Sequence, residues 1–477
     1  MNALRMLVLL PCALLASCKL GPDYVRPEVE TPAAWRMEYP QAADAANTKW
    51  WEQFGDTALN GLLEDALRGN LEIRAAAARV DQLLGALATT RSQFFPQLGY
   101  YGDASRNRAS QRGPTALPAG VDPTYSLYEG ALTASWQIDL FGRVRRQAEA
   151  IQAQVYASEQ GRRGLVLSIA SATVASYIGL RALDRQLEIA QATAKNYADS
   201  VHLFELRFKR GAVSEVELRQ VESQYYQAMA AIPSLEQSIA AQENLISILL
   251  GRNPGPIPRG LALDQIQPPA IPAGLPSDLL RRRPDILQAE QNLVAANAGI
   301  GAAKALYFPT ISLTGSFGSV STAFSDFLTG PSRAWAVGAD LAGPIFTFGG
   351  IEGQVRSAES ARDEALLVYR QTILAAFQQT NDALVGAQKK NMEVEALVKR
   401  VQALRDYARL SRRRFDNGTA SYIEVLYAEN ELFGAELNSV NTQAERFSQI
   451  INVYKAMGGG WVDVGAEIAA PKPPEGK

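Results

Sequence analysis

The chain contains two copies of one segment, and this internal repeat constrains the fold more than any other feature. The run RFKRG that starts at Arg207 returns as RFDNG at Arg414, a spacing of 207 residues. Other pairs keep nearly the same spacing: Phe141 and Phe348 at 207 residues, Phe95 and Phe308 at 213, and Ile73 and Ile286 at 213. A change of spacing between two strands is expected if their connecting loops differ in length. The pattern predicts two tandem copies of one supersecondary unit.

Each copy also contains a long segment that predicts an unusually long helix. Residues 142–208 and 349–415 contain no proline and are rich in alanine and charged residues. A helix of about 66 residues would be about 100 Å long at 1.5 Å per residue. Helices of ordinary globular domains average about 11–12 residues. We therefore expect elongated helices, with the shorter segments 214–250 and 277–306 stacked beside one long helix and Pro233 kinking the first of them.

The segment that follows Ser421 carries a heptad repeat. Every seventh position is large and apolar, and the complementary positions are mostly apolar: Leu426, Phe433, Val440, Phe447 and Tyr454, with Ile423, Asn430, Leu437, Ala444 and Ile451. This period is typical of a left-handed coiled coil. A core stripe in a soluble helix bundle has the same periodicity, so that alternative stays open.

Four segments of about ten residues alternate between apolar and polar side chains. They begin near Leu98, Leu132, Thr310 and Trp335, and aromatic residues recur near their ends. Such strands suit a lipid-facing surface with aromatic residues at the membrane interfaces, although a half-buried strand pair in a soluble sheet gives a similar signal. Four strands cannot close a barrel, and open edges leave backbone groups unpaired in hydrocarbon. A trimer of twelve strands would leave a water-filled lumen, whereas eight strands would be filled by side chains.

The N-terminus predicts a lipid anchor. Arg5 precedes an apolar run that is too short to span a bilayer, and the run ends in Leu-Ala-Ser before Cys18. This resembles a bacterial lipoprotein signal, in which the cysteine becomes the first mature residue and is acylated; an ordinary secretory signal is the alternative. Lys19, in place of the Asp that retains lipoproteins at the inner membrane, favours the outer membrane. Removal of the signal also removes Cys12, so no intramolecular disulfide is expected.

Composition argues against several other classes of protein. A net charge of −2 provides no basic field for nucleic acid. The one histidine, His202, has no metal-ligand spacing around it, and no phosphate loop or nucleophile elbow is present. We expect no catalytic residue, metal or cofactor, and the run at Arg281 marks a helix start. Beyond the signal no uncharged apolar stretch near 18 residues was recognised, so no transmembrane helix is expected.

Several motifs in order resemble the TolC-type outer-membrane factors, and most closely their lipoprotein branch. They are KLGPDY at 19–24, WW at 50–51, DLFGR at 139–143, LLRRRPDI at 279–286, YFPTISL at 307–313 and AMGGGW at 456–461. The resemblance implies a mainly α protein with a membrane β-barrel portion. It implies a homotrimer whose 12-stranded barrel, four strands from each protomer, continues into a periplasmic α-helical coiled-coil tunnel. It also implies a periplasmic adaptor and an inner-membrane pump of the RND type as partners in efflux.

The resemblance also assigns roles to individual residues. The two helical turns, at the far end of the long helices from the barrel, would dock the adaptor through Gly211, Ala212, Val213 and Ser214, and through Gly418, Thr419, Ala420 and Ser421. A gate is expected just past the second turn, at Ile423, Glu424 and Tyr427. Relatives carry an Asp where this chain has Tyr427, so three tyrosines would close the opening by packing. An ordinary helix contact is the alternative for Tyr427. Asp139 and Asp340 are assigned to the polar sides of two strands and are expected to face the lumen.

These patterns divide the chain into five segments. We expect a lipoprotein signal peptide at 1–17, an extended arm at 18–55, a first repeat at 56–260, a second repeat at 261–461 and a disordered tail at 462–477. The function expected is a passive exit duct in the outer membrane, anchored there by lipid. A lipid-anchored periplasmic coiled-coil scaffold without a pore is the alternative, and it leaves the four strands without a purpose.

Overall fold

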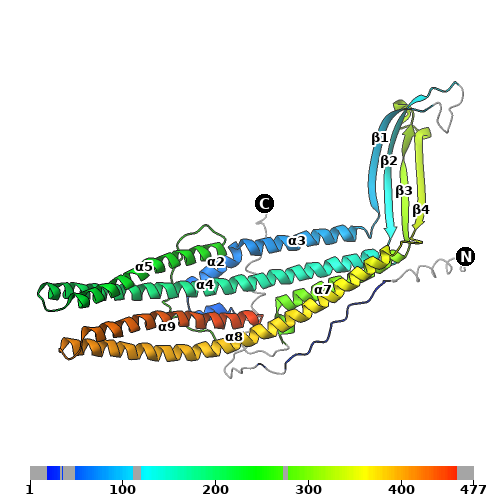
Figure 1. Cartoon of the computed structure of the whole chain (residues 1–477). Helices are drawn as coiled ribbons and strands as arrows, with labels where there is room; N and C mark the ends of the chain where they lie inside the picture. The colour runs from blue at the N-terminus through cyan, green and yellow to red at the C-terminus, as the bar shows by residue number, and fades with distance from the viewer. Residues whose placement is uncertain (1–18, 33–34, 36–48, 111–119, 272–277, 459–477) are drawn as a thin grey trace. The chain divides into compact units, whose positions relative to one another are not determined.

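The computed structural model describes residues 19–32, 35, 49–110, 120–271 and 278–458 (Figure 1). The predicted signal peptide, Cys18 and the predicted tail at 462–477 lie outside the described residues. Within the described part, long helices account for most of the chain and four strands form one sheet. The elements are η1 (Trp50–Phe54), α2 (Thr57–Gly69), α3 (Leu71–Ser92), β1 (Gln97–Arg108), β2 (Thr124–Ile138), α4 (Arg143–Lys209), α5 (Glu215–Leu249), α6 (Leu279–Arg282), α7 (Pro284–Lys304), η3 (Ala305–Tyr307), β3 (Thr310–Ser321), η4 (Phe324–Asp326), η5 (Gly330–Ser332), β4 (Arg333–Ala342), α8 (Gly350–Asp416) and α9 (Tyr422–Ala456).

The internal repeat predicted from the sequence is confirmed by the helix lengths. Helices α4 and α8 each contain 67 residues, and α5 and α9 each contain 35. The turns repeat as well, because glycines with positive φ recur at matching positions: Gly142 and Gly349, Gly211 and Gly418, Gly251 and Gly458. A side chain is strained in this backbone region, so glycine there ends or begins a helix at low cost. The two copies therefore share one backbone design.

The chain folds as two compact units, and each unit draws residues from both copies. The first unit is Met1–Glu28, Arg79–Ala157 and Ala289–Tyr369, and it contains the sheet. The second unit is Val29–Ala78, Ser158–Gln288 and Arg370–Lys477, and it contains the two helical turns after α4 and α8. The units thus divide the chain differently from the tandem copies, because each copy contributes two strands to one unit and a helical hairpin to the other.

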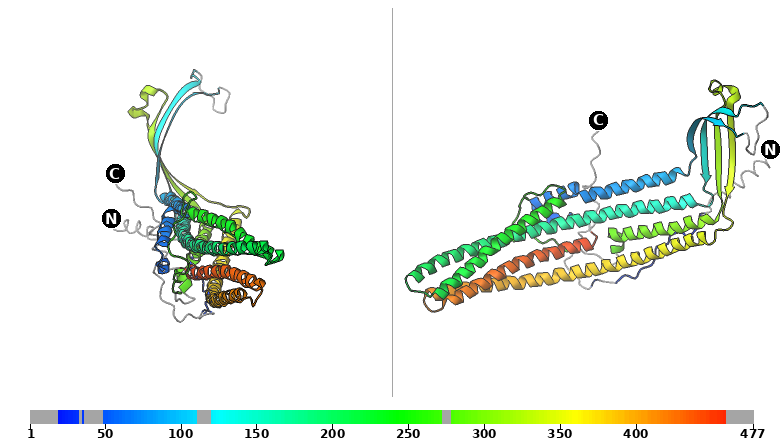
Figure 2. Two further views of the ribbon diagram at one scale, coloured as in Figure 1. Left: turned by 90° about the vertical axis from the view of Figure 1, so that its left-hand side faces the viewer. Right: turned by 45° about the horizontal axis from the view of Figure 1, so that its top comes forward.

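The sheet in the first unit is antiparallel throughout. Its strand order is β1-β2-β3-β4, so neighbours in sequence are neighbours in space (Figure 2). The register is unbroken from Gln97↔Ser135 to Arg108↔Thr124, and β3 joins the two hairpins by pairing with β2. Among the described strands, β1 and β4 each pair on one side only. Each sheet edge therefore presents backbone groups to whatever lies beside it.

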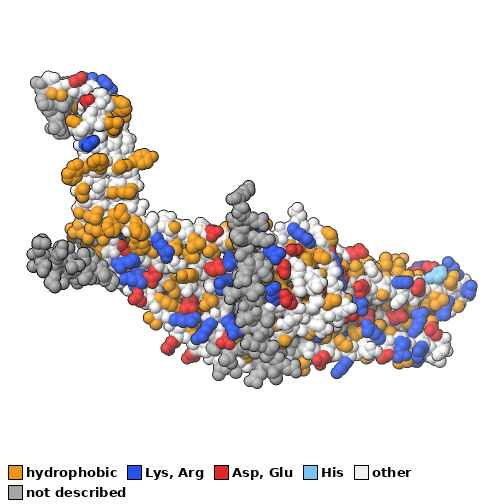
Figure 3. All heavy atoms as spheres, turned by 180° about the vertical axis from the view of Figure 1, so that it is seen from behind, with side chains coloured by type: hydrophobic (Ala, Val, Ile, Leu, Met, Phe, Trp, Pro, Cys, Tyr) orange, Lys and Arg blue, Asp and Glu red, His pale blue; other side chains and the backbone are white. Residues whose placement is uncertain are grey.

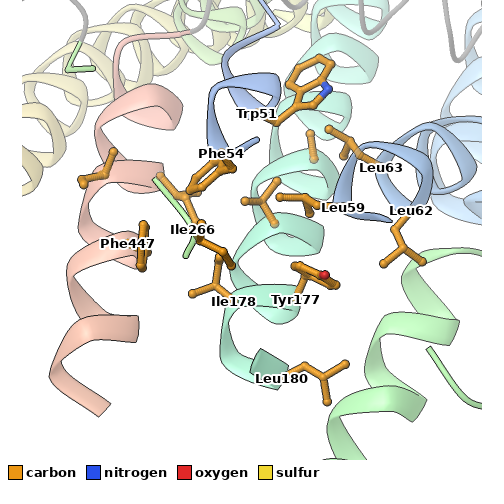
Figure 4. Packing of buried hydrophobic residues seen from close by; sticks show 14 of the residues in the cluster. Trp51, Phe54, Leu59, Leu62, Leu63, Tyr177, Ile178, Leu180, Ile266 and Phe447 are labelled. Carbon is orange, nitrogen blue, oxygen red and sulfur yellow. The ribbon is translucent and has the colours of Figure 1, made fainter. Parts of the chain in front are cut away.

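The core of the second unit lies where η1 and α2 pack on α4 and α9 (Figure 4). The ring of Trp50 stacks on Tyr454 with 4.8 Å between centroids, and Phe54 lies 5.9 Å from Phe447. Asp56 caps α2 by accepting from Ala58 N at 2.9 Å, and its other oxygen accepts from the Tyr177 hydroxyl at 2.8 Å. Burial is the main cause of the raised pKa of Tyr177, followed by its bond to Asp56. This buried polar contact ties α2 to α4.

One described helix, α4, is by length and composition long and apolar enough to cross a membrane, which corrects the expectation that no such stretch follows the signal. An 18-residue window of α4 has a mean hydropathy of 1.5. Within that window 61% is buried inside the structure, and α4 supplies Val166, Ala170, Val174 and Ile178 to the core. Packing against neighbouring helices accounts for the apolar stretch, because buried core helices share this length and composition.

Candidate functional site

One face of the sheet is apolar and exposed, and its side chains align in rows across the strands. The clearest row is Tyr100, Leu132, Phe317 and Trp335, which the register places directly opposite one another across all four strands. All four are exposed, from 60% for Phe317 to 88% for Tyr100. Hydrophobic side chains also form rows across the strands in the space-filling view (Figure 3). An outward apolar band with aromatic residues is typical of strands that face lipid.

The opposite face of the same strands carries small and polar side chains. Thr133, Ser316 and Ala336 form one row, and Ser312 lies opposite Asp340 in the next strand. Asp340 lies within β4 and is exposed, as a lumen-facing residue would be. The alternation predicted from the sequence therefore extends to the whole sheet, with one lipid-compatible face and one water-compatible face.

The structure corrects the assignment of Asp139 to a strand. Strand β2 ends at Ile138, and Asp139 lies in the connection to α4. Its carboxylate accepts from Val144 N at 3.1 Å and from Arg145 N at 2.9 Å, and it pairs with the Arg145 guanidinium at 3.3 Å. The free N–H groups at a helix start favour an anion. Asp139 thus stabilises the start of α4, and the role of its charge in a lumen remains a prediction.

The described part of the N-terminal arm is held to the first unit by a buried arginine. The side chain of Arg146, which is only 1% exposed, donates to the carbonyls of Leu20 at 2.8 Å and Gly21 at 2.9 Å. It also pairs with Asp23 at 3.1 Å, which lowers the pKa of that carboxyl. Gly21 has a φ of +85° and lies so close to Gly301 that a Cβ there would be 2.5 Å from its Cα.

Two further contacts continue this attachment along the arm. Asn297 donates to the carbonyl of Pro22 at 2.9 Å, and Glu290 accepts from Arg26 at 2.9 Å and from the Tyr24 hydroxyl at 3.2 Å. The residues that follow the predicted lipidation site are therefore fixed against the body. The role of Arg146 was missed from the sequence. A comparison of the two copies could have indicated it: the matching position in the second copy is Gly353, so the fold that the copies share does not require an arginine there.

The two helical turns predicted to dock an adaptor have nearly the same backbone. Gly211 donates to Phe208 O at 2.8 Å, and Ala212 donates to Arg207 O at 2.9 Å. The matching bonds of the second turn, from Gly418 to Phe415 O and from Thr419 to Arg414 O, are 2.9 and 2.8 Å long. Most of the eight predicted docking residues are exposed; Val213 and Ala420 are half-buried. Both turns thus present short backbone segments to solvent.

Beneath the turns, aromatic residues from both copies form one buried cluster. Phe204 of α4 lies 4.3 Å from the ring centroid of Tyr422 on α9, and Phe415 of α8 lies 4.8 Å from that ring. The guanidinium of Arg207 lies 5.3 Å from the centroid of Phe415. Phe204 is 0% exposed and Tyr422 is 2% exposed. This tip cluster joins the helical hairpins of the two copies, as expected for packed aromatic rings.

The predicted gate residues lie in the first turns of α9 and differ in their surroundings. Ile423 is 54% exposed and Tyr427 is 61% exposed, and they are four positions apart on the helix, so they share one face. Glu424 is half-buried and accepts from Arg414 at 2.7 Å and from Ser411 at 3.3 Å, both on α8. The apolar pair is therefore free to contact another surface, whereas the carboxylate is engaged within its own hairpin.

A cavity of about 510 Å³ lies between α4 and the α8–α9 hairpin, farther along the helices from the turn. Glu429 lines it, 4.0 Å from Arg412, and the buried hydroxyl of Tyr197 has no hydrogen-bond partner among the described residues. Burial raises the pKa of Glu429, and Arg412 partly opposes that shift. Sequence reasoning missed Glu429, because the heptad pattern identifies apolar positions and not the polar residues between them.

The described residues do not bring reactive groups together. His202 is exposed on α4, and in the described part of the chain no group of three His, Cys, Asp or Glu is placed to hold a metal ion. The notable features are instead surfaces: an apolar sheet face, a polar sheet face and two exposed turns.

Known proteins that resemble this chain are outer-membrane efflux proteins. The family model described as outer membrane efflux protein matches residues 62–252 and 275–459. The chain is 32% identical over 457 residues to the probable efflux pump outer membrane protein TtgC of Pseudomonas putida, covering 94% of each. It is 31% identical to the cation efflux system protein CusC of Escherichia coli, covering 94% of this chain and 96% of that one. The solved structure of the outer-membrane channel OprN matches with a TM-score of 0.85 at 30% identity, over 93% of this chain and all of that chain.

Proposed function

Because this chain belongs to the outer membrane efflux protein family, we propose that three copies of it form the outer-membrane exit duct of a tripartite efflux system. The protein is a passive channel. Each protomer contributes four strands to a 12-stranded barrel, and its helices form the periplasmic tunnel. A periplasmic adaptor and an inner-membrane pump complete the system, and we propose that the pump is of the RND type.

The observation that carries this function is the apolar row that crosses the whole sheet. Tyr100 and Trp335 lie on the two edge strands and are as exposed as the residues between them. An apolar face suits hydrocarbon, but each unpaired backbone group at an open edge costs several kcal/mol there. Pairing β1 of one protomer with β4 of the next removes both edges and continues the row around a closed barrel. A scaffold without a pore has no use for such a face.

We propose that the opening is controlled at the start of α9. The exposed side chains of Ile423 and Tyr427 share one face, and three copies of that face around an axis would form an apolar constriction. The ion pair between Glu424 and Arg414 would hold α9 against α8 and so fix the direction in which that face points. Asp340, on the polar face of the sheet, would add negative charge to the lumen of the barrel.

We propose that the adaptor binds the two exposed turns. Their matching backbone lets one adaptor tip recognise both copies, so three protomers offer six similar docking positions. The carried compound is set by the pump rather than by the duct. In support of this, the chain is about as similar to a relative named for toluene efflux, at 33% identity, as to one named for cation efflux, at 31%.

The channel itself is tested with the purified lipoprotein in planar bilayers. A channel gives discrete conductance steps and migrates as a trimer that dissociates on heating in detergent. A lipid-anchored scaffold would give an oligomer with no conductance, and that result would overturn the proposal.

The gate is tested with Tyr427→Ala, compared with Gln220→Ala at the matching position of the first copy. Removing the ring should widen the constriction, so the leak of vancomycin into cells and the resting conductance should rise several-fold. The Gln220 variant should behave as the wild type, because its position belongs to the other hairpin. Equal leak in both variants would mean that Tyr427 is an ordinary helix contact.

A further inference from the structure

The loop between β3 and β4, residues 322–332, carries three large apolar side chains although it leaves the end of the sheet. Phe324 is 73% exposed and Leu328 is 85% exposed, while Phe327 is half-buried. Loops at a water-filled surface usually carry polar residues, and a cluster of exposed apolar side chains marks an interaction surface. Leu328 is among the most exposed apolar residues of the described chain.

The loop has a defined fold, which keeps these side chains in place. The carbonyl of Asp326 accepts from the hydroxyls of Thr329 and Ser332, both at 2.7 Å. At the start of the loop, Ser321 Oγ donates to Ala323 O at 2.6 Å, and the N–H of Ala323 donates back at 3.1 Å. These short internal bonds make the loop a compact turn.

Contacts with the sheet show over which face the loop folds. A Cβ added to Gly130 would lie 2.9 Å from the Cζ of Phe327, so that ring covers Gly130. The ring of Phe324 lies 5.5 Å from that of Tyr128. Tyr128 and Gly130 alternate in register with Leu132, so all three belong to the apolar face. The loop therefore folds back over the same face that carries the row from Tyr100 to Trp335.

Without the loop, the apolar face would have a gap at the row of strand residues that the loop covers. The next row beyond Tyr100–Trp335 is Gly102, Gly130, Ser319 and Arg333, which has no apolar side chain of its own. The loop supplies aromatic rings where the strands supply glycine. Arg333 lies in this row and is exposed, and a long cationic side chain at such a level can extend to lipid phosphate.

We propose that the β3–β4 loop is a membrane anchor that places Phe324, Phe327 and Leu328 at the boundary between acyl chains and headgroups of the outer leaflet. The inference rests on the proposed function, which puts the apolar face in lipid. The β3–β4 connection lies at the opposite ends of these strands from α7 and α8, and those helices are periplasmic, so the loop lies at the outer side. Continuity with the lipid-facing row identifies acyl chains as the occupant.

The test uses single cysteines for spin labelling in the full lipidated trimer, reconstituted in phospholipid vesicles. The chain has only two cysteines, and the lipid on Cys18 and the loss of the signal leave no other thiol to react. The label goes at Leu328→Cys, with Val337→Cys on the apolar face and Ala336→Cys on the polar face of β4 as matched controls. Oxygen enters the bilayer and the nickel complex Ni(II)-EDDA stays in water, so the ratio of their collision rates with the label reports depth.

We expect the ratio at Leu328→Cys to lie between the two controls: below that at Val337→Cys, which is two rows farther into the apolar face, and several-fold above that at Ala336→Cys. A ratio equal to that at Ala336→Cys would place the loop in water and overturn the inference. Low collision with both reagents would mean that a neighbouring protomer covers the loop, which overturns it as well. If Val337→Cys itself failed to collide with oxygen, the lipid-facing sheet and the proposed function would fail instead.

Discussion

The two helical turns have the same backbone and different side-chain chemistry. Both follow a 67-residue helix and precede a 35-residue helix, and both glycines, Gly211 and Gly418, have a φ of +71°. The side chains around them have diverged. Position 204 is a buried Phe in the first copy, and the matching position in the second copy is a buried Ser411. Duplication preserved what the turn requires, while the contacts made by each hairpin became specialised.

The matching glutamates show what this specialisation does. Glu217 of the first copy accepts from the backbone N of Ser214 at 2.8 Å and so completes a capping box within α5. Glu424 of the second copy instead accepts from Arg414 on α8, and Ser421 caps α9 without such a box. The first turn is thus stabilised within one helix, and the second by contacts between two helices.

The largest difference between the copies should appear on shortening Phe204. Phe204→Ala leaves a cavity in the tip cluster and should lower the stability of that region by about 3–5 kcal/mol. Ser411→Ala removes one hydrogen bond to Glu424 and should cost only about 1 kcal/mol. Hydrogen exchange of peptides from both turns measures the two effects. Similar losses for both variants would mean that the cluster is not shared between the hairpins.

A smaller difference is expected from the helix caps. Ser214→Ala should lower the stability of the first turn of α5 by about 1 kcal/mol, because the Ser214 hydroxyl loses its bonds with the backbone N and the carboxylate of Glu217. Ser421→Ala should cost less, since α9 is also held through Glu424. Exchange rates of the amides in the first turn of each helix compare the caps directly. A larger effect at Ser421 would contradict the contrast drawn between the two turns.

The smallest effect should come from Glu429, and it should depend on pH. Burial raises the pKa of Glu429, so the folded protein binds a proton there at a pH at which the unfolded chain, with a pKa near 4.5, has released it. The folded state therefore loses stability as the pH rises from that ordinary value through the raised pKa. Glu429→Gln should slightly raise the melting temperature at pH 7 and leave it unchanged below pH 4.5.

The first copy provides the control for Glu429. Glu222 occupies the matching position and accepts from Arg219 at 2.8 Å on the same helix. Glu222→Gln removes this exposed ion pair and should change stability little, in the destabilising direction. Stabilisation of equal size in both variants would show that burial at Glu429 is not the cause.

Much of the fold could be predicted because periodicity and turn residues are local signals. The long helices were expected at 142–208 and 349–415 and lie at Arg143–Lys209 and Gly350–Asp416. The segment expected at 277–306 is instead divided into α6 and α7, since Pro284 starts a new helix after Arg283. Alternation along β2 continues past Ile138, which is why Asp139 was assigned to the strand although it caps α4.

The remaining features depend on contacts between distant parts of the chain. Nothing local in the sequence indicates that Arg146 binds the carbonyls of Leu20 and Gly21, or that Phe327 covers Gly130. A periodic pattern indicates that a face is apolar but not what will lie against it. The exposed pair Ile423 and Tyr427 was expected from family resemblance and stays a prediction as a gate, since its partners would be other protomers.

The bonds from Arg146 to the arm also determine how far a lipid on Cys18 can reach. Only Lys19 lies between that cysteine and Leu20, and two residues of extended chain span at most about 7 Å, so a lipid there would be attached close to the held backbone. An acyl group on so short a connection can move only a short distance from this point of attachment. In a trimer, three such groups would act as stops that set how deeply the barrel sits and keep it from tilting.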